Sequence, residues 1–269
     1  MRYEMLVLDL DGTLTNSEKK ITPPTREALI EIQKAGKKVV LASGRPTPGI
    51  TPLADILKLD EFGSYILAFN GARIINCRTG EIIYDKTFPN NAIPEVIGIT
   101  KQFDVNVITY TDKEILSNSK PNQYTEIESR ITGMPIVPVD DFVKAIDFPI
   151  NKLLVTGEPA SIGRIENLLK KKFNKFLGIY QSQPFFLEVV PQNIDKAQSL
   201  QKLLNSIGLT ADQMICCGDG HNDLSMIEYA GLGVAMANAE PLVKEKADYI
   251  TKSNDEDGVL YVINQFMRD

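Results

Sequence analysis

Polar side chains of types that can do chemistry stand directly after short apolar runs of this sequence. They are Asp9, Asp11, Ser43, Asn70, Asp219, Asn222 and Asp223. In a parallel sheet the carboxyl ends of the strands share one edge, so residues far apart in the sequence can meet there. Carboxylates held close together repel one another unless a cation shares the site or some of them are protonated. We therefore expect an acidic pocket, whose oxygen ligands favour a hard cation such as Mg²⁺.

The elements that must position these residues are visible as an alternation of apolar runs and helical patterns. The predicted buried strands, each ending in a polar turn, are residues 5–8, 38–42 and 65–69. Between the first two strands, Thr22 and Pro23 open a helix that Gly36 closes. This alternation predicts an α/β fold with a doubly wound, Rossmann-like parallel sheet and a site at the carboxyl ends of its strands.

The middle of the chain changes character and is punctuated by prolines. We predict strands there at residues 105–110, 152–156 and 177–181, and a helix at residues 160–173. The alternation resumes after an apolar run at 186–190, with a helix at 196–207 closed by Gly208 and a strand at 214–217. We therefore expect a catalytic core of residues 1–84 plus 187–269, and an inserted α+β cap domain of residues 85–186.

Composition excludes several classes of protein. With 43% apolar and 24% charged residues the chain is typical of a globular protein, and 29 Lys and Arg against 35 Asp and Glu give a net charge of −6. Nucleic-acid binding by bulk electrostatics is therefore disfavoured. The apolar runs fall short of the ~20 residues that span a bilayer, and acids interrupt the first run, so we expect neither a membrane span nor a signal peptide, and a cytoplasmic location.

Cysteine and histidine are too few for several kinds of site. Cys77, Cys216 and Cys217 cannot form a disulfide framework and lack metal-site spacing, so we interpret them as small buried hydrophobes in strands. The single histidine, His221, excludes a zinc site built on two histidines of one chain. We interpret His221 as a loop residue near the site without a catalytic role.

Each motif alone has an ordinary structural explanation. The sequence Asp-Gly-Thr at residues 11–13 is typical of a turn, and Asp223 could simply stand beside the positive end of the following helix. A lysine at a helix start, such as Lys196, is usually solvated. What favours a site is that all of them occur together, each where a strand end or a helix start would aim it at one place.

In this order, the residues resemble the motifs of the haloacid dehalogenase superfamily, specifically its Cof-type phosphatases of subclass IIB, which carry a C2 cap between the second and third motifs. The matching segments are residues 9–13, Ser43, Lys196 and residues 218–223. Asn70 and Gly71 resemble a loop that these proteins place beside the active site. The resemblance covers the whole chain, with one departure at Ala197, where the relatives usually have glycine.

The resemblance implies a phosphoryl transfer through two carboxylates. Asp9 would attack the phosphorus and form an aspartyl-phosphate, and Asp11 would protonate the leaving alcohol and then deprotonate the attacking water. For this acid role the pKa of Asp11 should lie above that of Asp9. A Mg²⁺-dependent phosphatase of small phosphorylated metabolites, sugar phosphates first, follows from this resemblance.

The other site residues are assigned on the same basis. The phosphoryl group would be bound by Leu10, Ser43, Gly44, Lys196 and Asn222. The metal would be held by Asp9, Asp11 through its main-chain carbonyl, Asp219 and Asp223, the last either directly or through water. The substrate candidates are Arg45, Asn70 and Gly71, and Arg45 could alternatively meet a carboxylate from the cap. The cap would act as a lid, with specificity candidates at Glu114, Asn118, Asn122 and Lys152.

Two alternatives remain open from the sequence. A sugar phosphomutase would use the same aspartyl-phosphate but return it to a sugar hydroxyl, although mutases of this superfamily usually carry a smaller helical cap just after the first motif. A receiver-like signalling domain would also present an acidic pocket on a doubly wound sheet. The length of the chain and the presence of Asp11 disfavour the receiver.

Overall fold

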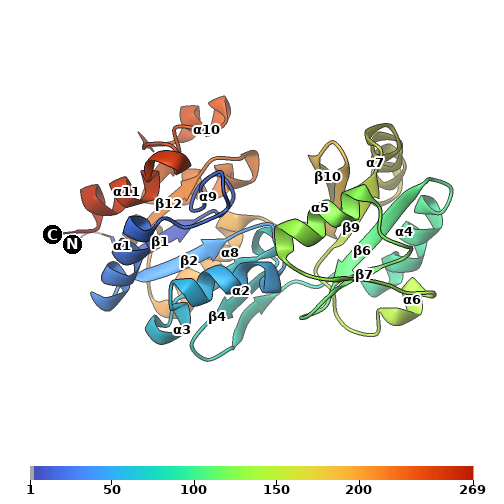
Figure 1. Ribbon diagram of the computed structural model, residues 1–269, viewed down its shortest axis with the longest axis horizontal. Coiled ribbons are helices and arrows are strands. Elements are labelled where there is room, and N and C mark those ends of the chain that lie inside the picture. The colour runs from blue at the N-terminus through green and yellow to red at the C-terminus, as the bar shows by residue number, and fades with distance from the viewer. Residues whose placement is uncertain (1–2, 269) are drawn as a thin grey trace. The chain divides into compact units, whose positions relative to one another are not determined.

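The computed structural model describes residues 3–268, and the chain divides into two units (Figure 1). The core unit comprises Met1–Tyr84 and Asp195–Asp269, and the inserted unit comprises Asp85–Ile194. The division after residue 84 coincides with the expected first boundary, whereas the division after residue 194 lies eight residues beyond the expected second boundary at 186.

The core unit contains an eight-stranded sheet in the order β14-β13-β12-β1-β2-β3-β4-β5. These strands are β1 (Met5–Leu8), β2 (Lys38–Ala42), β3 (Tyr65–Ala68), β4 (Arg73–Asn76), β5 (Ile82–Asp85), β12 (Met214–Gly218), β13 (Leu232–Ala235) and β14 (Tyr249–Ile250). From β14 to β3 every neighbouring pair is parallel. Every residue of β1 is buried, because helices cover both faces of a parallel sheet, and this explains its uninterrupted apolar run.

Helices pack on both faces of this sheet, as the expected doubly wound fold requires. They are α1 (Pro23–Lys34), α2 (Thr47–Ile56), α3 (Leu59–Phe62), α8 (Lys196–Ile207), α9 (Leu224–Tyr229), α10 (Pro241–Lys246) and α11 (Gly258–Phe266). Met5 and Val7 pack in one hydrophobic cluster with residues of α8 and α9. Helix α1 instead contacts α11 and β2 (Figure 1). The predicted helix signals are confirmed, since Thr22 caps α1 and Gly208 ends α8 with φ +72°.

The sheet ends in an antiparallel edge that the sequence analysis did not predict. β4 runs antiparallel to β3, so the chain doubles back here instead of crossing over through a helix. The reversal happens in the short 3₁₀ turn η1 (Phe69–Gly71), where Phe69, Asn70 and Gly71 all have positive φ. β3 therefore ends at Ala68, one residue before the predicted end.

The inserted unit is a six-stranded mixed sheet with helices, in the order β10-β11-β9-β6-β7-β8. Its strands are β6 (Val105–Tyr110), β7 (Ile115–Ser117), β8 (Ile136–Pro138), β9 (Leu153–Gly157), β10 (Leu177–Gln183) and β11 (Phe186–Pro191). Its helices are α4 (Ile93–Thr100), α5 (Gln123–Thr132), α6 (Phe142–Ala145) and α7 (Pro159–Phe173). A hydrophobic core of its own, with side chains from α4, α7 and the central strands, supports the expected α+β character.

Two expectations are corrected by this topology. The apolar run at 186–190 is not the start of the resumed core, because β11 pairs antiparallel with both β9 and β10 and so belongs to the inserted unit. Cys216 and Cys217 are buried in β12 as expected, but Cys77 is half-buried in the turn after β4. Within residues 3–268, we find no helix with the length and apolarity that a bilayer crossing demands.

Candidate active site

Three neighbouring strands of the core sheet bring the predicted site residues together. β12, β1 and β2 are adjacent and parallel, so their carboxyl ends lie side by side. Asp9 follows β1, Ser43 follows β2, and Asp219 follows β12. The predicted convergence at one sheet edge is therefore present in the fold.

Lys196 is the centre of a buried group of charges. Its Nζ donates hydrogen bonds to Asp9 Oδ1 at 2.7 Å, to Asp223 Oδ1 at 2.6 Å and to the Ala42 carbonyl at 2.9 Å. Lys196 and Asp223 are each only 1% exposed, and Asp9 is 7% exposed. We refer to Asp9, Lys196, Asp219 and Asp223 as the inner cluster.

The burial of Lys196 distinguishes it from an ordinary lysine at a helix start. It is the first residue of α8, and Asp195 caps that helix by accepting a hydrogen bond from the Gln198 N–H. Burial alone would lower the pKa of Lys196, but the negative charges of Asp223 and Asp9 outweigh it and raise the pKa above its ordinary value. The ammonium is therefore charged and shared by two carboxylates.

The inner cluster carries more negative charge than its lysine can balance. Asp9, Asp219 and Asp223 each place a carboxylate oxygen within 4.8 Å of the other two. Burial, followed by repulsion from Asp223, raises the pKa of Asp9 well above its ordinary value despite Lys196. Burial likewise raises the pKa of Asp219 to about 6. Three carboxylates around one ammonium are a donor set that fits a hard divalent cation such as Mg²⁺.

Both carboxylate oxygens of Asp223 accept hydrogen bonds within the site. Its Oδ2 accepts hydrogen bonds from the N–H groups of Asp219 and Gly220, both at 3.0 Å, while its Oδ1 accepts from Lys196. Gly218 allows this approach, since a Cβ there would lie 2.5 Å from the Asp223 Cβ. Asp223 therefore links the loop at residues 218–223 to the buried lysine.

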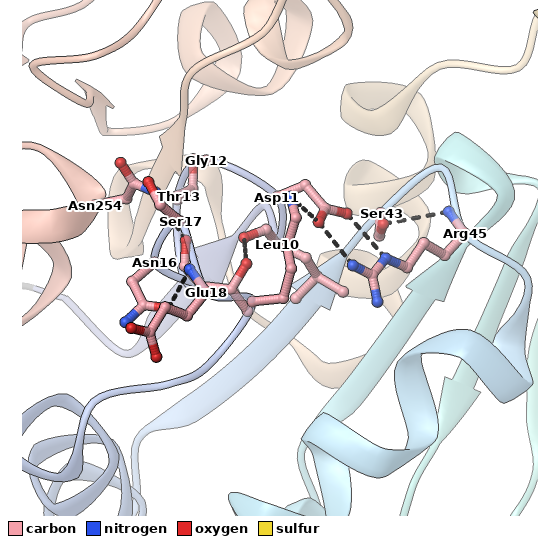
Figure 2. Close-up of polar contacts among 12 residues, drawn as sticks. Leu10, Asp11, Gly12, Thr13, Asn16, Ser17, Glu18, Ser43, Arg45 and Asn254 are labelled. Carbon is pink, nitrogen blue, oxygen red and sulfur yellow. Dashed lines mark hydrogen bonds and ion pairs between the residues drawn. The ribbon is translucent and has the colours of Figure 1, made fainter. Parts of the chain in front are cut away.

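Asp11, only two residues after Asp9, has different surroundings. Arg45 donates to it twice, from Nε to Oδ2 at 2.8 Å and from Nη2 to Oδ1 at 2.6 Å (Figure 2). Lys19 Nζ donates to the same Oδ1 at 2.9 Å. The side chain of Asp11 is 35% exposed. We refer to Asp11, Arg45 and Lys19 as the outer cluster.

The outer cluster gives Asp11 a different electrostatic setting from that of Asp9. Burial would raise the pKa of Asp11, but hydrogen bonds and charge from Arg45 and Lys19 outweigh it and lower the pKa. Among the chain's own groups the pKa of Asp11 therefore lies below that of Asp9, because burial and two neighbouring carboxylates raise the pKa of Asp9 whereas two cations face Asp11. The expected opposite order, with metal on Asp9 and substrate bound, stays a prediction. Arg45 thus pairs with a carboxylate of its own unit, Asp11.

The predicted phosphate and substrate residues form a group around the ends of β2 and β3. The Asn70 N–H donates to the Ser43 carbonyl at 2.9 Å, and Asn222 Nδ2 donates to Asn70 Oδ1 at 3.2 Å. A Cβ on Gly44 would lie 3.1 Å from Asn70 Nδ2, so this glycine allows a close approach. Ser43, Gly44, Asn70 and Asn222 are thus brought together.

Two other predicted residues contribute through their backbone. The Leu10 side chain is fully buried, so only its peptide group could face a phosphoryl group, and its carbonyl accepts from the Thr15 N–H and hydroxyl. The carbonyl of Gly71 accepts from Ser199 Oγ at 2.6 Å, and a Cβ on Gly71 would lie 2.7 Å from that oxygen. Gly71 is therefore placed against α8.

The cap candidates have mainly local roles in the inserted unit. Asn118 Oδ1 accepts from the Val107 N–H, and Asn122 caps α5, whereas Glu114 is half-buried beside a turn. Lys152 is different, since it forms a buried ion pair of 2.9 Å with Glu188. Of the four, Lys152 alone holds a buried charge.

Two residues that contact carboxylates of the site, Thr13 and Lys19, were not predicted from the sequence. Thr13 Oγ1 donates to Asp219 Oδ1 at 2.6 Å, and the hydroxyl in the Asp-Gly-Thr motif was the available signal. Lys19 had no local signal, because its contact with Asp11 depends on a turn at residues 16–20 in which Lys19 has φ +61°. His221 is exposed in the 3₁₀ turn η4 (His221–Asp223). The expectation that His221 has no catalytic role stays a prediction.

Comparison with known proteins adds independent information. A family model of haloacid dehalogenase-like hydrolases matches residues 6–263. A solved haloacid dehalogenase-like hydrolase from Bacteroides thetaiotaomicron is 45% identical, with a TM-score of 0.96 over 98% of this chain and 99% of that one. The 5-amino-6-(5-phospho-D-ribitylamino)uracil phosphatase YcsE of Bacillus subtilis is 32% identical over 98% of this chain and 96% of its own. A solved sugar phosphatase of subclass IIB is 25% identical, with a TM-score of 0.80 over 98% and 99% of the two chains.

Proposed function

Because the chain belongs to the haloacid dehalogenase-like hydrolases and is a phosphoric monoester hydrolase, we propose that it hydrolyses small phosphorylated metabolites with Mg²⁺, through an aspartyl-phosphate on Asp9. The observation that carries this proposal is Lys196, whose buried ammonium lies within hydrogen-bond distance of both Asp9 and Asp223. A turn with a purely structural role would not bury a lysine among carboxylates, because removing these charges from water costs free energy.

In the first step, an Asp9 carboxylate oxygen forms a bond to phosphorus while the bond from phosphorus to the substrate oxygen breaks. Asp11 gives its proton to that departing oxygen and is left as a carboxylate. In the second step, water attacks the aspartyl-phosphate, Asp11 takes a proton from this water, and inorganic phosphate leaves Asp9 free again. Each step balances with water as the only co-reactant.

The remaining site residues stabilise charge during these steps. Lys196 would neutralise charge on Asp9 and on the transferring group, while Ser43, Gly44 and Asn222 would donate to the phosphoryl oxygens, with Leu10 contributing its peptide. Mg²⁺ would be held by Asp9, Asp219, Asp223 and the main-chain carbonyl of Asp11, and it would supply further neutralisation of the phosphoryl charge.

Asp11 must change partners to do its part. Its carboxylate accepts hydrogen bonds from Arg45 and Lys19, and these two cations favour its ionised form. As a general acid, however, Asp11 must be protonated. The binding of a phosphate dianion brings negative charge that competes for Arg45, and this favours release and protonation of Asp11. Arg45 is therefore our candidate for a residue that first meets the substrate, together with Asn70 and Gly71.

Sugar phosphates are the proposed substrate class because one similar solved protein is named as a sugar phosphatase and another relative as a phosphatase of a phosphorylated ribityl compound. The lid role of the inserted unit, and with it the choice of leaving group, stays a prediction.

The test is release of phosphate from p-nitrophenyl phosphate and from a panel of sugar phosphates, with Mg²⁺ and with EDTA. We expect activity with Mg²⁺ that EDTA abolishes and that Asp9→Asn lacks. Release of free phosphate without a bisphosphate activator would separate the hydrolase from a mutase. Full activity of Asp9→Asn, or activity unaffected by EDTA, would contradict the proposal.

A further inference from the structure

The loop after β1 is held by side chains from two turns near the C-terminus. This loop, residues 11–20, carries Asp11, Gly12 and Thr13 of the site and also Lys19. The turns are the segment after β13, which contains Asn238, and the 3₁₀ turn η5 (Asn254–Glu256) just before α11. All of these residues belong to the core unit.

The first half of the loop is held by a chain of two asparagine amides. Asn238 Nδ2 donates to the Gly12 carbonyl at 2.8 Å, and Asn254 Nδ2 donates to the Thr15 carbonyl at 2.9 Å. The two asparagines are themselves linked, because the Asn254 N–H donates to Asn238 Oδ1 at 3.0 Å. Figure 2 shows Asn254 approaching the loop on the side away from Arg45.

The second half of the loop is held by Asp255. Its two carboxylate oxygens accept from the N–H of Ser17 at 2.8 Å and from the Ser17 hydroxyl at 2.6 Å. Ser17 lies in the turn at residues 16–20, where Asn16 Oδ1 accepts from the N–H groups of Glu18 and Lys20. This turn places Lys19 so that its Nζ reaches Asp11.

A movement of this part of the loop would disturb the active site, because Gly12 and Thr13 both lie against Asp219. Gly12 has φ +90°, and a Cβ on it would lie 2.4 Å from Asp219 Oδ2. Thr13 Oγ1 donates to the same carboxylate. A shift of the Gly12 peptide therefore changes both the Asp219 contact and the direction of the adjacent Asp11 carbonyl.

We propose that Asn238, Asn254 and Asp255 are positioning residues, which hold the loop so that Asp11 and the Gly12 peptide keep their places beside the inner cluster. The proposal rests on the function proposed above, in which Asp11 transfers protons and its main-chain carbonyl would help to hold Mg²⁺. None of the three contacts the reacting groups, so they act through the loop. Asn238 and Asp255 are exposed, so a role in core packing does not account for them.

The experiment compares Asn238→Ala, Asn254→Ala and their double variant with Glu256→Gln as the matched control. Glu256 lies in the same turn as Asn254, but its carboxylate accepts from Ser253 within that turn and not from the loop. We measure kcat, KM and the Mg²⁺ concentration for half-activation with p-nitrophenyl phosphate, and the melting temperature of each protein. Hydrogen exchange of the amides of residues 12–20 is followed in metal-free protein.

Each asparagine variant should lower kcat about tenfold, since displacements near 1 Å cost that much or more, and should raise the Mg²⁺ requirement while KM changes less than about twofold. The combined loss in the double variant should be smaller than the product of the two single losses, because Asn238→Ala also removes the acceptor of the Asn254 N–H. Exchange of the loop amides should be about tenfold faster, with the melting temperature almost unchanged. Glu256→Gln should match the wild type in every measurement.

Three results would overturn the inference. They are unchanged kcat and loop exchange in both asparagine variants, the same losses in Glu256→Gln, or losses that follow the melting temperature. An inactive wild type would instead contradict the proposed function, and the hydrogen-exchange comparison would still decide whether these residues hold the loop.

Discussion

Asp9 of the inner cluster and Asp11 of the outer cluster are only two residues apart, yet their electrostatic surroundings are opposite. In the inner cluster Asp9 is buried beside two other carboxylates and shares one ammonium with Asp223. In the outer cluster Asp11 is one half-exposed carboxylate between two cations, Arg45 and Lys19. The inner cluster thus has an excess of negative charge, and the outer cluster an excess of positive charge.

This difference shows how one strand end can supply two chemical roles. Residues two apart on an extended strand point the same way, but the chain turns at Gly12 just after β1, and Asp11 is already in the turn. A site that attracts a dication and a site that attracts an anion are therefore neighbours. A phosphate monoester with its metal carries both charges, which is why the pair suits phosphoryl transfer.

Removing the only ammonium of the inner cluster should have the largest effect. Lys196→Met leaves Asp9 and Asp223 buried without their cation, and breaking a buried pair in this way costs about 3–5 kcal/mol of the free energy of unfolding. Phosphate release should fall by at least about a thousandfold. Urea unfolding and steady-state rates check both effects.

Lys202→Met is the control for this prediction, since Lys202 is exposed on the same helix and contacts the ring of Tyr84. It should change neither quantity substantially. A Lys196→Met protein as stable as Lys202→Met would show that the inner carboxylates do not depend on this ammonium.

Asp11→Asn should separate activity from stability. We expect a rate loss of about 10²–10⁴ with sugar phosphates, because the leaving alkoxide needs a proton. The first step with p-nitrophenyl phosphate should be affected less, since its leaving phenolate is a weaker base. The free energy of unfolding should change by less than about 1 kcal/mol, because the ion pairs of Asp11 are partly exposed. Equal rate losses for both substrates would contradict the acid role.

Gly12→Ala tests the closeness of the two clusters. The added Cβ would meet Asp219, and the positive φ adds strain of about 1–3 kcal/mol. Gly36→Ala is matched, because Gly36 has φ +92° but no atom within 4 Å of an added Cβ. Both variants should lose stability in thermal unfolding, whereas only Gly12→Ala should also require more Mg²⁺. A raised Mg²⁺ requirement in both would show that backbone strain alone is responsible.

Lys19→Met should have the smallest effect. Its side chain is 59% exposed, so water and salt screen its contact with Asp11, and kcat/KM should change by less than about threefold. The pKa of Asp11 should rise with loss of this cation. Because Asp11 must be protonated in the first step, the alkaline limb of the kcat/KM profile should move to higher pH. Lys20→Met, whose Nζ pairs with Glu18 instead, should leave the profile in place.

Helices and strands could be predicted from the sequence where residues close to their ends mark them. β1, β2, α1 and α8 were predicted at or near their observed ends, because proline, capping residues and glycine mark helix boundaries within a few positions. The sheet to which β11 belongs was not predictable in this way, because an apolar run has the same appearance in either unit and only its pairing with β9 and β10 decides.

The same distinction applies to the site. Asp9, Lys196, Asp219 and Asp223 come together because each follows a strand or starts a helix of the core sheet. The Arg45 and Lys19 contacts with Asp11 depend on side-chain directions in two loops, and the hold of Asn238 and Asn254 on Gly12 and Thr15 spans more than 220 residues of sequence. No periodic pattern reports such contacts.

The most direct test of the account is to identify which aspartate carries the phosphoryl group. The wild-type protein with Mg²⁺ and a sugar phosphate that it hydrolyses is quenched in acid during turnover and treated with borohydride, which reduces an aspartyl-phosphate to homoserine. Mass spectrometry of the peptide containing residues 9 and 11 then locates the change. We expect homoserine at Asp9 and an unmodified Asp11. Modification at Asp11, or turnover without modification of either residue, would contradict it.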